Sequence, residues 1–381
     1  MFTDLNRIPA ALYVHFPWCI RKCPYCDFNS HALHGTIPDE AYSRVLATDI
    51  EKELLALGDR QIISIFFGGG TPSLMAVQSI SSVIDVVSLS GHLATNAEIT
   101  LEANPGSLDA ARFKGYFDAG VNRLSIGAQS FNDKALKTLG RIHDARQIHK
   151  AYETARQCGF ENINIDLMFG LPQQTFDEAK RDLDIAFELN PEHISYYQLT
   201  LEPNTLFHHQ PPELPDDDTL WQIHENGLQQ LAENHYAQYE VSAFAKSGKQ
   251  CQHNLNYWSY GDYIGVGAGA HGKLTDSEQV LRYSKPRSPK DYLSCAKDFR
   301  RSEKPVNDVN RRFEYLLNAL RLKAGFSLIE YVQRTGDSVD EILTKLQPMI
   351  DKELVRIDDQ TVRATERGYL YLNDILEPFL P

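Results

Sequence analysis

The sequence predicts an α/β protein with a mostly parallel sheet, followed by a smaller module at its carboxyl end. Two observations carry this prediction. Short runs rich in β-branched residues alternate with amphipathic helical stretches over residues 12–198, and a pattern of helices and a hairpin begins near residue 305. Repeated strand–helix alternation is typical of a parallel sheet covered by helices. With 381 residues and a hydrophobic content of 42%, the chain has the composition of an ordinary globular protein with a large core.

Six apolar runs are the expected strands: residues 12–15, 62–67, 97–101, 123–127, 162–167 and 193–198. Helical faces lie between them. Apolar residues recur at helical spacing from Tyr42 to Leu57 and again from Phe176 to Phe187. Six such units suit either an incomplete barrel or an open doubly wound sheet, and the pattern alone does not separate the two.

The character of the chain changes after residue 210. We expect a helix to begin near Asp218, since the aspartates there can cap it and favour its positive end. A glycine-rich stretch follows at residues 263–273. Beyond it, apolar stripes at helical spacing over 313–320 and 339–350 precede a predicted hairpin at 354–365. Helices followed by a hairpin predict a winged-helix-like module. The expected division of the chain is 1–215, a connecting region 216–304, and 305–381.

The charge of the chain limits its partners. A net charge of −13 argues against a nucleic-acid backbone as the main partner, so we expect a structural role for the winged-helix-like module. No window holds the ~20 apolar residues of a membrane span, and the amino-terminal stretch has no apolar run of signal-peptide length. These observations predict a cytoplasmic protein without a membrane span, in which thiols stay reduced.

Three of the six cysteines, Cys19, Cys23 and Cys26, fall within eight residues. A reduced compartment makes metal binding a better explanation than disulfides. Zinc would require a fourth ligand, for which His31 is available. An iron–sulfur cube normally takes four thiolates, so three would leave one iron open to a small molecule. The spacing C-x3-C-x2-C, in a loop directly after the first strand, favours the cluster over zinc.

This cysteine motif after a first barrel strand resembles that of the radical S-adenosylmethionine (SAM) superfamily. The resemblance extends to "YVHFPWC", "FGGGTPS", "LEANPGS", "RLSIGAQSF", "NIDLMFGLPQQT" and "SYYQLTLEPNT", which look like the oxygen-independent coproporphyrinogen III oxidase family. More narrowly, "CPYCDFNSH", "LPDDD" and "CQHNLNYW" resemble its heme-chaperone branch, the HemW-type proteins. The resemblance covers nearly the whole chain. It implies a radical-SAM partial (β/α)6 barrel with a smaller α+β, winged-helix-like carboxyl-terminal domain.

The resemblance also implies the residues that hold cofactors. Cys19, Cys23 and Cys26 would bind a [4Fe–4S] cluster, and SAM would bind its open iron. Gly69, Gly70 and Thr71, at the end of the second strand, would meet the amino and carboxylate groups of SAM. A tight turn explains the glycines equally well from the residues alone. Further SAM contacts would come from polar or aromatic side chains at or near other strands: Tyr13, Tyr25, Glu102, Gln129, Arg141 and Asp166.

A second motif, H-N-x-x-Y-W, begins at His253 and is the proposed heme-binding motif of the chaperone branch. Imidazole is a common axial ligand to heme iron, and Tyr257 and Trp258 offer aromatic surface for a porphyrin face. Cys251 and His271 are alternative ligands. From the residues alone, a histidine beside aromatics is more often a packed, hydrogen-bonded residue.

Phe28 stands where the oxidase carries a further cysteine, and only about eleven residues precede the first expected strand, whereas the oxidase has a long extension there. Both differences argue against the oxidase activity. The resemblance to the chaperone branch then implies a protein that binds heme and transfers it to an acceptor, for which we expect a membrane-bound respiratory protein, with a reductant protein serving the cluster. The alternative is a radical-SAM enzyme, either a coproporphyrinogen III dehydrogenase or one that oxidises a related substrate.

Overall fold

A computed structural model describes residues 2, 4–107, 110–295 and 298–381 of the chain. Its centre is a run of six parallel strands, paired in the order in which they occur along the chain. These strands are β1 (Ala10–Phe16), β4 (Ile62–Gly69), β5 (Leu93–Ala103), β6 (Arg123–Gln129), β7 (Ile163–Phe169) and β8 (His193–Gln198). A doubly wound sheet reverses its strand order at a switch point, and this run does not. The order therefore selects the incomplete barrel, and the predicted α/β fold class is confirmed.

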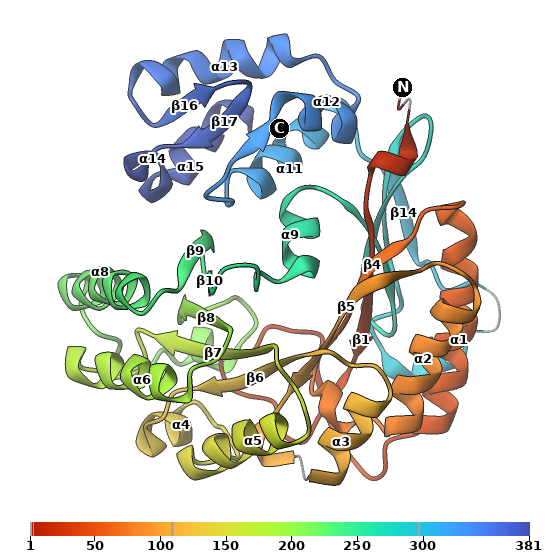
Figure 1. Ribbon diagram of the computed structural model, residues 1–381, viewed down its shortest axis with the longest axis vertical. Coiled ribbons are helices and arrows are strands. Elements are labelled where there is room, and N and C mark those ends of the chain that lie inside the picture. Colours follow the sequence, from red (N-terminus) through yellow and green to blue (C-terminus); the bar gives the residue numbers. More distant parts are fainter. Residues whose placement is uncertain (1, 3, 108–109, 296–297) are drawn as a thin grey trace.

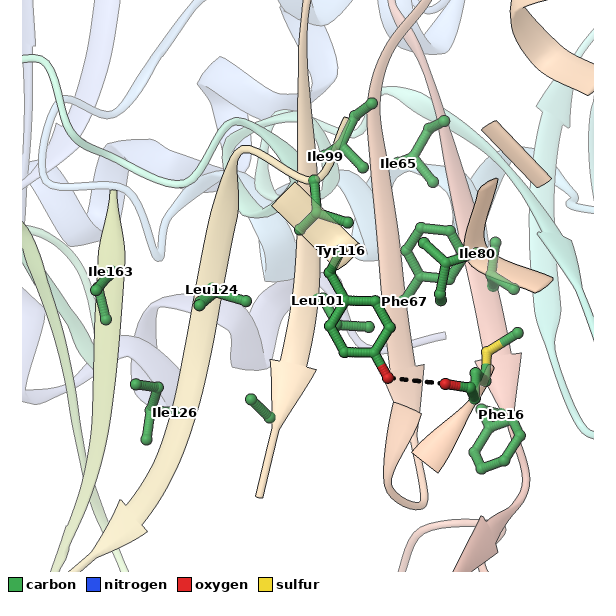
Figure 2. Packing of buried hydrophobic residues seen from close by; sticks show 14 of the residues in the cluster. Phe16, Ile65, Phe67, Ile80, Ile99, Leu101, Tyr116, Leu124, Ile126 and Ile163 are labelled. Carbon is green, nitrogen blue, oxygen red and sulfur yellow. Dashed lines mark hydrogen bonds between the residues drawn. The ribbon is translucent and has the colours of Figure 1, made fainter. Parts of the chain in front are cut away.

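Helices cover the outer side of this curved sheet (Figure 1). They are α1 (Asp39–Leu54), α2 (Val77–Leu89), α3 (Ala110–Asp118), α4 (Asp133–Thr138), α5 (Ala145–Gln157) and α6 (Phe176–Leu189). Figure 2 shows how Ile65, Phe67, Leu101 and Leu124 on neighbouring strands pack with Ile80 of α2 and Tyr116 of α3. Burial of such apolar side chains is the main force that holds helices on a sheet.

The sheet continues beyond both ends of the parallel run, to twelve strands in all. On the β8 side, α7 (Leu206–His209) and α8 (Asp217–Glu233) lead to two antiparallel strands, β9 (Ala237–Glu240) and β10 (Ala243–Ala245). On the β1 side, α10 (Pro289–Leu293) lies between the last two of four added strands: β11 (Asp262–Val266), β12 (His271–Thr275), β13 (Val280–Ser284) and β14 (Ser302–Pro305). The helix expected near Asp218 begins one residue earlier, because the Asp216 side chain accepts the Thr219 amide at 2.8 Å.

A short helix, α9 (Gln252–Trp258), lies on the inner side of the curved sheet, between the sheet and the carboxyl-terminal domain (Figure 1). That domain has its own core, to which Tyr260 contributes from the turn after α9. Its elements are α11 (Asp308–Ala319), β15 (Phe326–Ser327), α12 (Leu328–Thr335), α13 (Val339–Asp351), β16 (Val355–Asp358), β17 (Thr361–Ala364), α14 (Glu366–Leu370) and α15 (Leu372–Leu376). Helices followed by the β16–β17 hairpin match the predicted pattern. No helix in the described residues is both long and apolar enough to span a membrane.

Candidate functional site

A cavity of about 640 Å³ lies at the carboxyl ends of the parallel strands. In barrels of parallel strands this is the end at which active sites form. Most of the predicted cofactor residues line it, namely Cys19, Cys23, Tyr25, Cys26, Gly69, Gly70, Thr71, Glu102, Gln129, Arg141 and Asp166. The structure thus brings together residues that are far apart in the sequence. The remaining two predicted residues, Tyr13 and His253, do not line this cavity.

The cysteine loop, residues 19–30, is folded back on itself. Its base is a pair of two-residue parallel strands, β2 (Trp18–Cys19) and β3 (His31–Ala32), which the sequence analysis missed. Inside the loop, the Lys22 ammonium donates hydrogen bonds to the carbonyls of Phe28 and Ser30, at 3.1 and 3.3 Å. These bonds fix the path of the loop, so the positions of the three thiols do not depend on a metal alone.

The three thiols do not form a site for a single metal ion. In the described part of the chain, no three His, Cys, Asp or Glu side chains gather closely enough to hold one ion. This counts against zinc with His31 as its fourth ligand, because zinc needs its ligands at about 2 Å from one point. Thiolates bind a [4Fe–4S] cube through separate irons and need not converge in this way. The cysteine set therefore fits a cluster better than zinc.

Backbone next to the loop is shaped for a closely bound ligand. Gly69, which ends β4, has a φ of +114°, a conformation that only glycine adopts without strain. At Gly70 any Cβ would collide with the carbonyl group of Trp18. The amide of Thr71 donates to that same carbonyl at 2.8 Å. Both glycines are thus required by local packing, and they also leave the backbone of this turn open to the cavity.

Two carboxyl groups lie in the cavity wall, and among the described residues neither has a cationic partner at hydrogen-bonding distance. Glu102 accepts the Gly69 amide at 3.2 Å. Burial, followed by the charge of Asp166, raises the pKa of Glu102 to about 8. Asp166 accepts hydrogen bonds from Ser125 and Asn164, at 3.1 and 2.8 Å, and burial raises its pKa as well. Both side chains are half-buried, and carboxyl groups of this kind are stabilised by ligands that carry hydroxyl or ammonium donors.

Gln129 and Arg141 complete the wall. Gln129 has a φ of +70°, which costs a non-glycine residue on the order of 1–2 kcal/mol. Its side-chain oxygen accepts the Tyr197 hydroxyl at 2.7 Å. Arg141 donates to the Gly127 carbonyl at 2.9 Å and lies 3.9 Å from the Cys23 sulfur. Its buried Nε has no hydrogen-bond partner among the residues that the structure describes. An unsatisfied guanidinium nitrogen fits an anionic ligand group. Together with the two acids, it makes this wall suitable for a zwitterionic, hydroxyl-bearing cofactor such as SAM.

His253 lies deeper, between α9 and the sheet. Its Nδ1 is 3.0 Å from the Ser64 hydroxyl, and its ring centroid is 5.0 Å from that of Phe66 and 6.3 Å from that of Tyr13. Burial, followed by the charge of Arg123, lowers the pKa of His253 to about 3. The imidazole is therefore neutral, packed and hydrogen-bonded.

The start of α9 is held by a buried carboxylate that the sequence analysis did not single out. Glu98 of β5 accepts the amides of Gln252 and His253 at 3.1 and 3.2 Å. It also accepts the Cys251 thiol at 3.3 Å. Burial raises the pKa of Cys251 to about 12, so this cysteine is a protonated packing residue. Glu98 thus acts as the helix cap, and its contacts span more than 150 residues of sequence.

The two aromatic residues of the second motif face different spaces. Trp258 and Asn254 line the cavity, where Arg321 of the carboxyl-terminal domain lies over the Trp258 ring at 4.3 Å. Tyr257 instead lines a groove of about 360 Å³ together with Tyr263 and His271. Helix α9 therefore contributes to both spaces. Nothing in the sequence identified Arg321, since it reaches the cavity only through domain packing.

Comparison with known proteins agrees with this geometry. Residues 13–186 match the family described as the radical SAM superfamily, and residues 308–371 match the HemN carboxyl-terminal domain. The chain is 47% identical over 377 residues to the heme chaperone HemW of Haemophilus influenzae, and the aligned region covers 98% of both chains. HemW of Escherichia coli is also 47% identical, with 98% of both chains covered, and HemW of Bacillus subtilis is 33% identical over 379 residues.

A solved structure confirms the fold. Coproporphyrinogen III oxidase (HemN) from Escherichia coli, described as a radical SAM enzyme, superposes with a TM-score of 0.81 over 98% of this chain and 90% of its own. Its sequence identity is 22%, so this likeness concerns the fold alone. The full-length identity to the chaperones is more than twice as high. On this evidence the chain belongs to the HemW family of heme chaperones, built on the radical SAM fold.

Proposed function

We propose that this protein binds heme as cargo and transfers it to an acceptor protein, on a scaffold that holds a [4Fe–4S] cluster and SAM. The observation that carries this proposal is the 47% identity, over 98% of both chains, to proteins named heme chaperones. Phe28 also supports it. That side chain is 57% exposed at the rim of the cavity, so it neither replaces a cluster ligand nor closes the site.

The cysteine loop is the proposed cluster site, with Cys19, Cys23 and Cys26 as ligands. When bound, such a cluster supplies a single electron to SAM. The protein's own residues position the cluster ligands. Lys22 fixes the path of the loop. The Arg141 guanidinium near Cys23 offsets negative charge on the thiolates. Burial raises the pKa of Cys19 and Cys26, so cluster binding must displace their protons.

The wall opposite the loop is the proposed SAM site. Gly69, Gly70 and Thr71 would face the amino acid end of SAM, and Arg141 its carboxylate. The polar wall residues Glu102, Gln129 and Asp166 would meet its ammonium and ribose groups. Tyr25, which lines the cavity, would contact the adenine side. Tyr13 would act from beneath the glycine turn, where its ring is so close to Gly68 that a Cβ there would lie 2.9 Å from it.

The region of α9 is the proposed heme site. Two histidines are candidates for the axial ligand, His253 and His271. A bond from His253 would use Nε2, because Nδ1 is hydrogen-bonded to Ser64. This arrangement is typical of metal-binding histidines, whose other nitrogen is held by a second group. His271 differs in being exposed. Variants of the two histidines can therefore decide between them.

The cysteine loop is also the proposed docking surface for a reductant protein. Arg21, Lys22 and Lys137 line a groove on its outer side, and Ile20 and Leu206 beside them are 46% and 55% exposed. None of these three cations forms an ion pair within the described residues. In a chain with a net charge of −13, such a local excess of positive charge fits an acidic redox partner. The cytoplasm is the proposed compartment, and a respiratory membrane protein is the proposed heme acceptor.

The test is a transfer assay on the reconstituted protein. Hemin-loaded protein is mixed, without oxygen, with membranes that contain a heme-free respiratory acceptor, and the absorbance of the acceptor's heme is followed. We expect heme to move at stoichiometric yield, with no protoporphyrinogen formed when coproporphyrinogen III, SAM and reductant are supplied. Many turnovers of protoporphyrinogen without heme transfer would instead support the enzyme alternative and overturn the proposal.

A further inference from the structure

We infer that heme is held in the groove on the side of α9 that faces β11–β13, with His271 rather than His253 as its axial ligand. This inference rests on the proposed function. The groove has a volume of about 360 Å³ and lies between the added strands of the sheet and α11 of the carboxyl-terminal domain. Its walls include Tyr257, Tyr263, His271, Arg282 and Leu317.

The two histidines differ in how accessible their rings are to heme iron. His271 is exposed, and in the part of the chain that the structure describes its ring has no hydrogen-bond partner. His253 is wedged beside Phe66, is hydrogen-bonded to Ser64, and lines neither the cavity nor the groove. An iron atom has less access to His253, which is only partly exposed, than to His271. It can approach His271 from solvent.

The chemistry around His271 suits an imidazole ligand. A ligand nitrogen must be unprotonated. Partial burial, followed by the charges of Arg282 and Arg287, lowers the pKa of His271. Arg282 is held by Glu314 at 2.7 Å and by the Tyr263 hydroxyl at 2.7 Å. Arg287 is exposed but lines a separate pocket beside the cysteine loop, so Arg282 is the cation in the wall of this groove.

The walls of the groove suit one edge of a porphyrin. The Tyr257 and Tyr263 rings lie 5.3 Å apart between centroids and form one wall. On the facing helix, Leu317 is 41% exposed although it is apolar. A volume of about 360 Å³ is at the low end of the range for small-molecule sites. The groove would therefore grip one edge of heme and leave the other in solvent, as transfer to an acceptor requires.

The experiment is a hemin titration of the full-length protein, followed by the Soret absorbance, on wild type and three alanine variants. These are His271→Ala, His253→Ala and, as an exposed control away from the groove, His34→Ala. We expect His271→Ala alone to weaken binding at least tenfold and to shift the Soret band. Added imidazole should restore the wild-type spectrum in His271→Ala, an effect that a merely structural histidine would not show.

A second pair of variants tests the groove without changing β12, so that the inference stays testable if His271→Ala disturbs that strand. Leu317→Glu places a charge in the groove without touching the strand, and Leu370→Glu is its control on an apolar residue that is 52% exposed outside the groove. We expect several-fold weaker hemin binding in the first and wild-type binding in the second. Wild-type affinity and spectrum in His271→Ala would overturn the inference alone. The absence of saturable hemin binding in wild type would overturn the proposed function and the inference with it.

Discussion

The two spaces that flank α9 differ in the chemistry of the side chains that line them. The cavity beside the cysteine loop is lined by half-buried acids, a glycine turn and the guanidinium of Arg141, whose Nε has no hydrogen-bond partner among the described residues. The groove beyond α9 is lined by tyrosines, an exposed histidine and an exposed leucine. The first suits a small polar cofactor that must be shielded. The second suits an apolar cargo that must leave again.

In the proposed assignment, one helix separates the site of a resident cofactor from the site of a heme that is passed on. Helix α9 contributes Trp258 to the cavity and Tyr257 to the groove, while His253 packs between the helix and the sheet. The two spaces share a helix but no lining residue. Variants can therefore change one site and leave the other intact.

The largest effect is expected from Cys23→Ser, which removes one of the three proposed cluster ligands. Reconstitution with iron and sulfide should then yield almost no cluster, measured as bound iron and visible absorbance. Cys158→Ser and Cys295→Ser are matched controls, since neither residue lines the cavity, and both should retain full cluster content. Equal iron content in Cys23→Ser and the controls would contradict the assignment of the loop.

The next effect concerns Glu102 and pH. Its pKa is raised from 4.5 to about 8, so between these values the folded protein holds a proton that the unfolded chain has released. The free energy of unfolding must then fall as pH rises through this window. Glutamine at this position does not titrate. We therefore expect the Glu102→Gln variant to be more stable than wild type at pH 8 by on the order of 2–4 kcal/mol. Urea unfolding of cofactor-free protein at pH 5 and pH 8 measures the difference, and parallel pH profiles for the two proteins would refute it.

A smaller effect is expected for His253→Ala. Losing the contact with Phe66 and the hydrogen bond with Ser64 should lower the free energy of unfolding by about 1–3 kcal/mol. Cluster content should not change, because His253 does not line the cavity. Chemical denaturation and iron analysis on the same sample test both parts. Unchanged stability combined with lost heme binding would make His253 a ligand rather than a packing residue.

The smallest effect is expected for Phe28→Ala. Because the side chain is 57% exposed, its removal should change the free energy of unfolding by less than about 0.5 kcal/mol. Cluster content and SAM affinity should stay at wild-type values. A large loss of cluster would contradict this prediction and would show that Phe28 shields the iron from solvent.

The cavity was far more predictable from the sequence than the groove. Strand ends are visible as the last apolar residue before a polar one, so Glu102, Gln129 and Asp166 could be placed at a common edge. The glycine run and the cysteine spacing are equally local signals. The groove depends on contacts between segments far apart in the chain, such as Tyr257 against Tyr263 and both facing Leu317. No periodicity reports such contacts.

Two details near the cavity and α9 were also beyond prediction from the sequence. The left-handed backbone of Gln129 has no local signal, because a glutamine in a strand pattern predicts extended backbone. The cap that Glu98 provides for α9 links residues 154 positions apart. The H-N-x-x-Y-W motif predicts one heme-binding unit, whereas its side chains lie in three different environments.

The most direct test of this account is a hemin titration of a Cys19→Ser/Cys23→Ser/Cys26→Ser variant beside the wild type. The account places the cluster and the cargo on opposite sides of α9. It therefore predicts that the cluster-free variant binds one heme with the same affinity and the same Soret maximum as wild type. Loss of hemin binding together with the cluster would contradict separate sites and would put heme in the cysteine cavity.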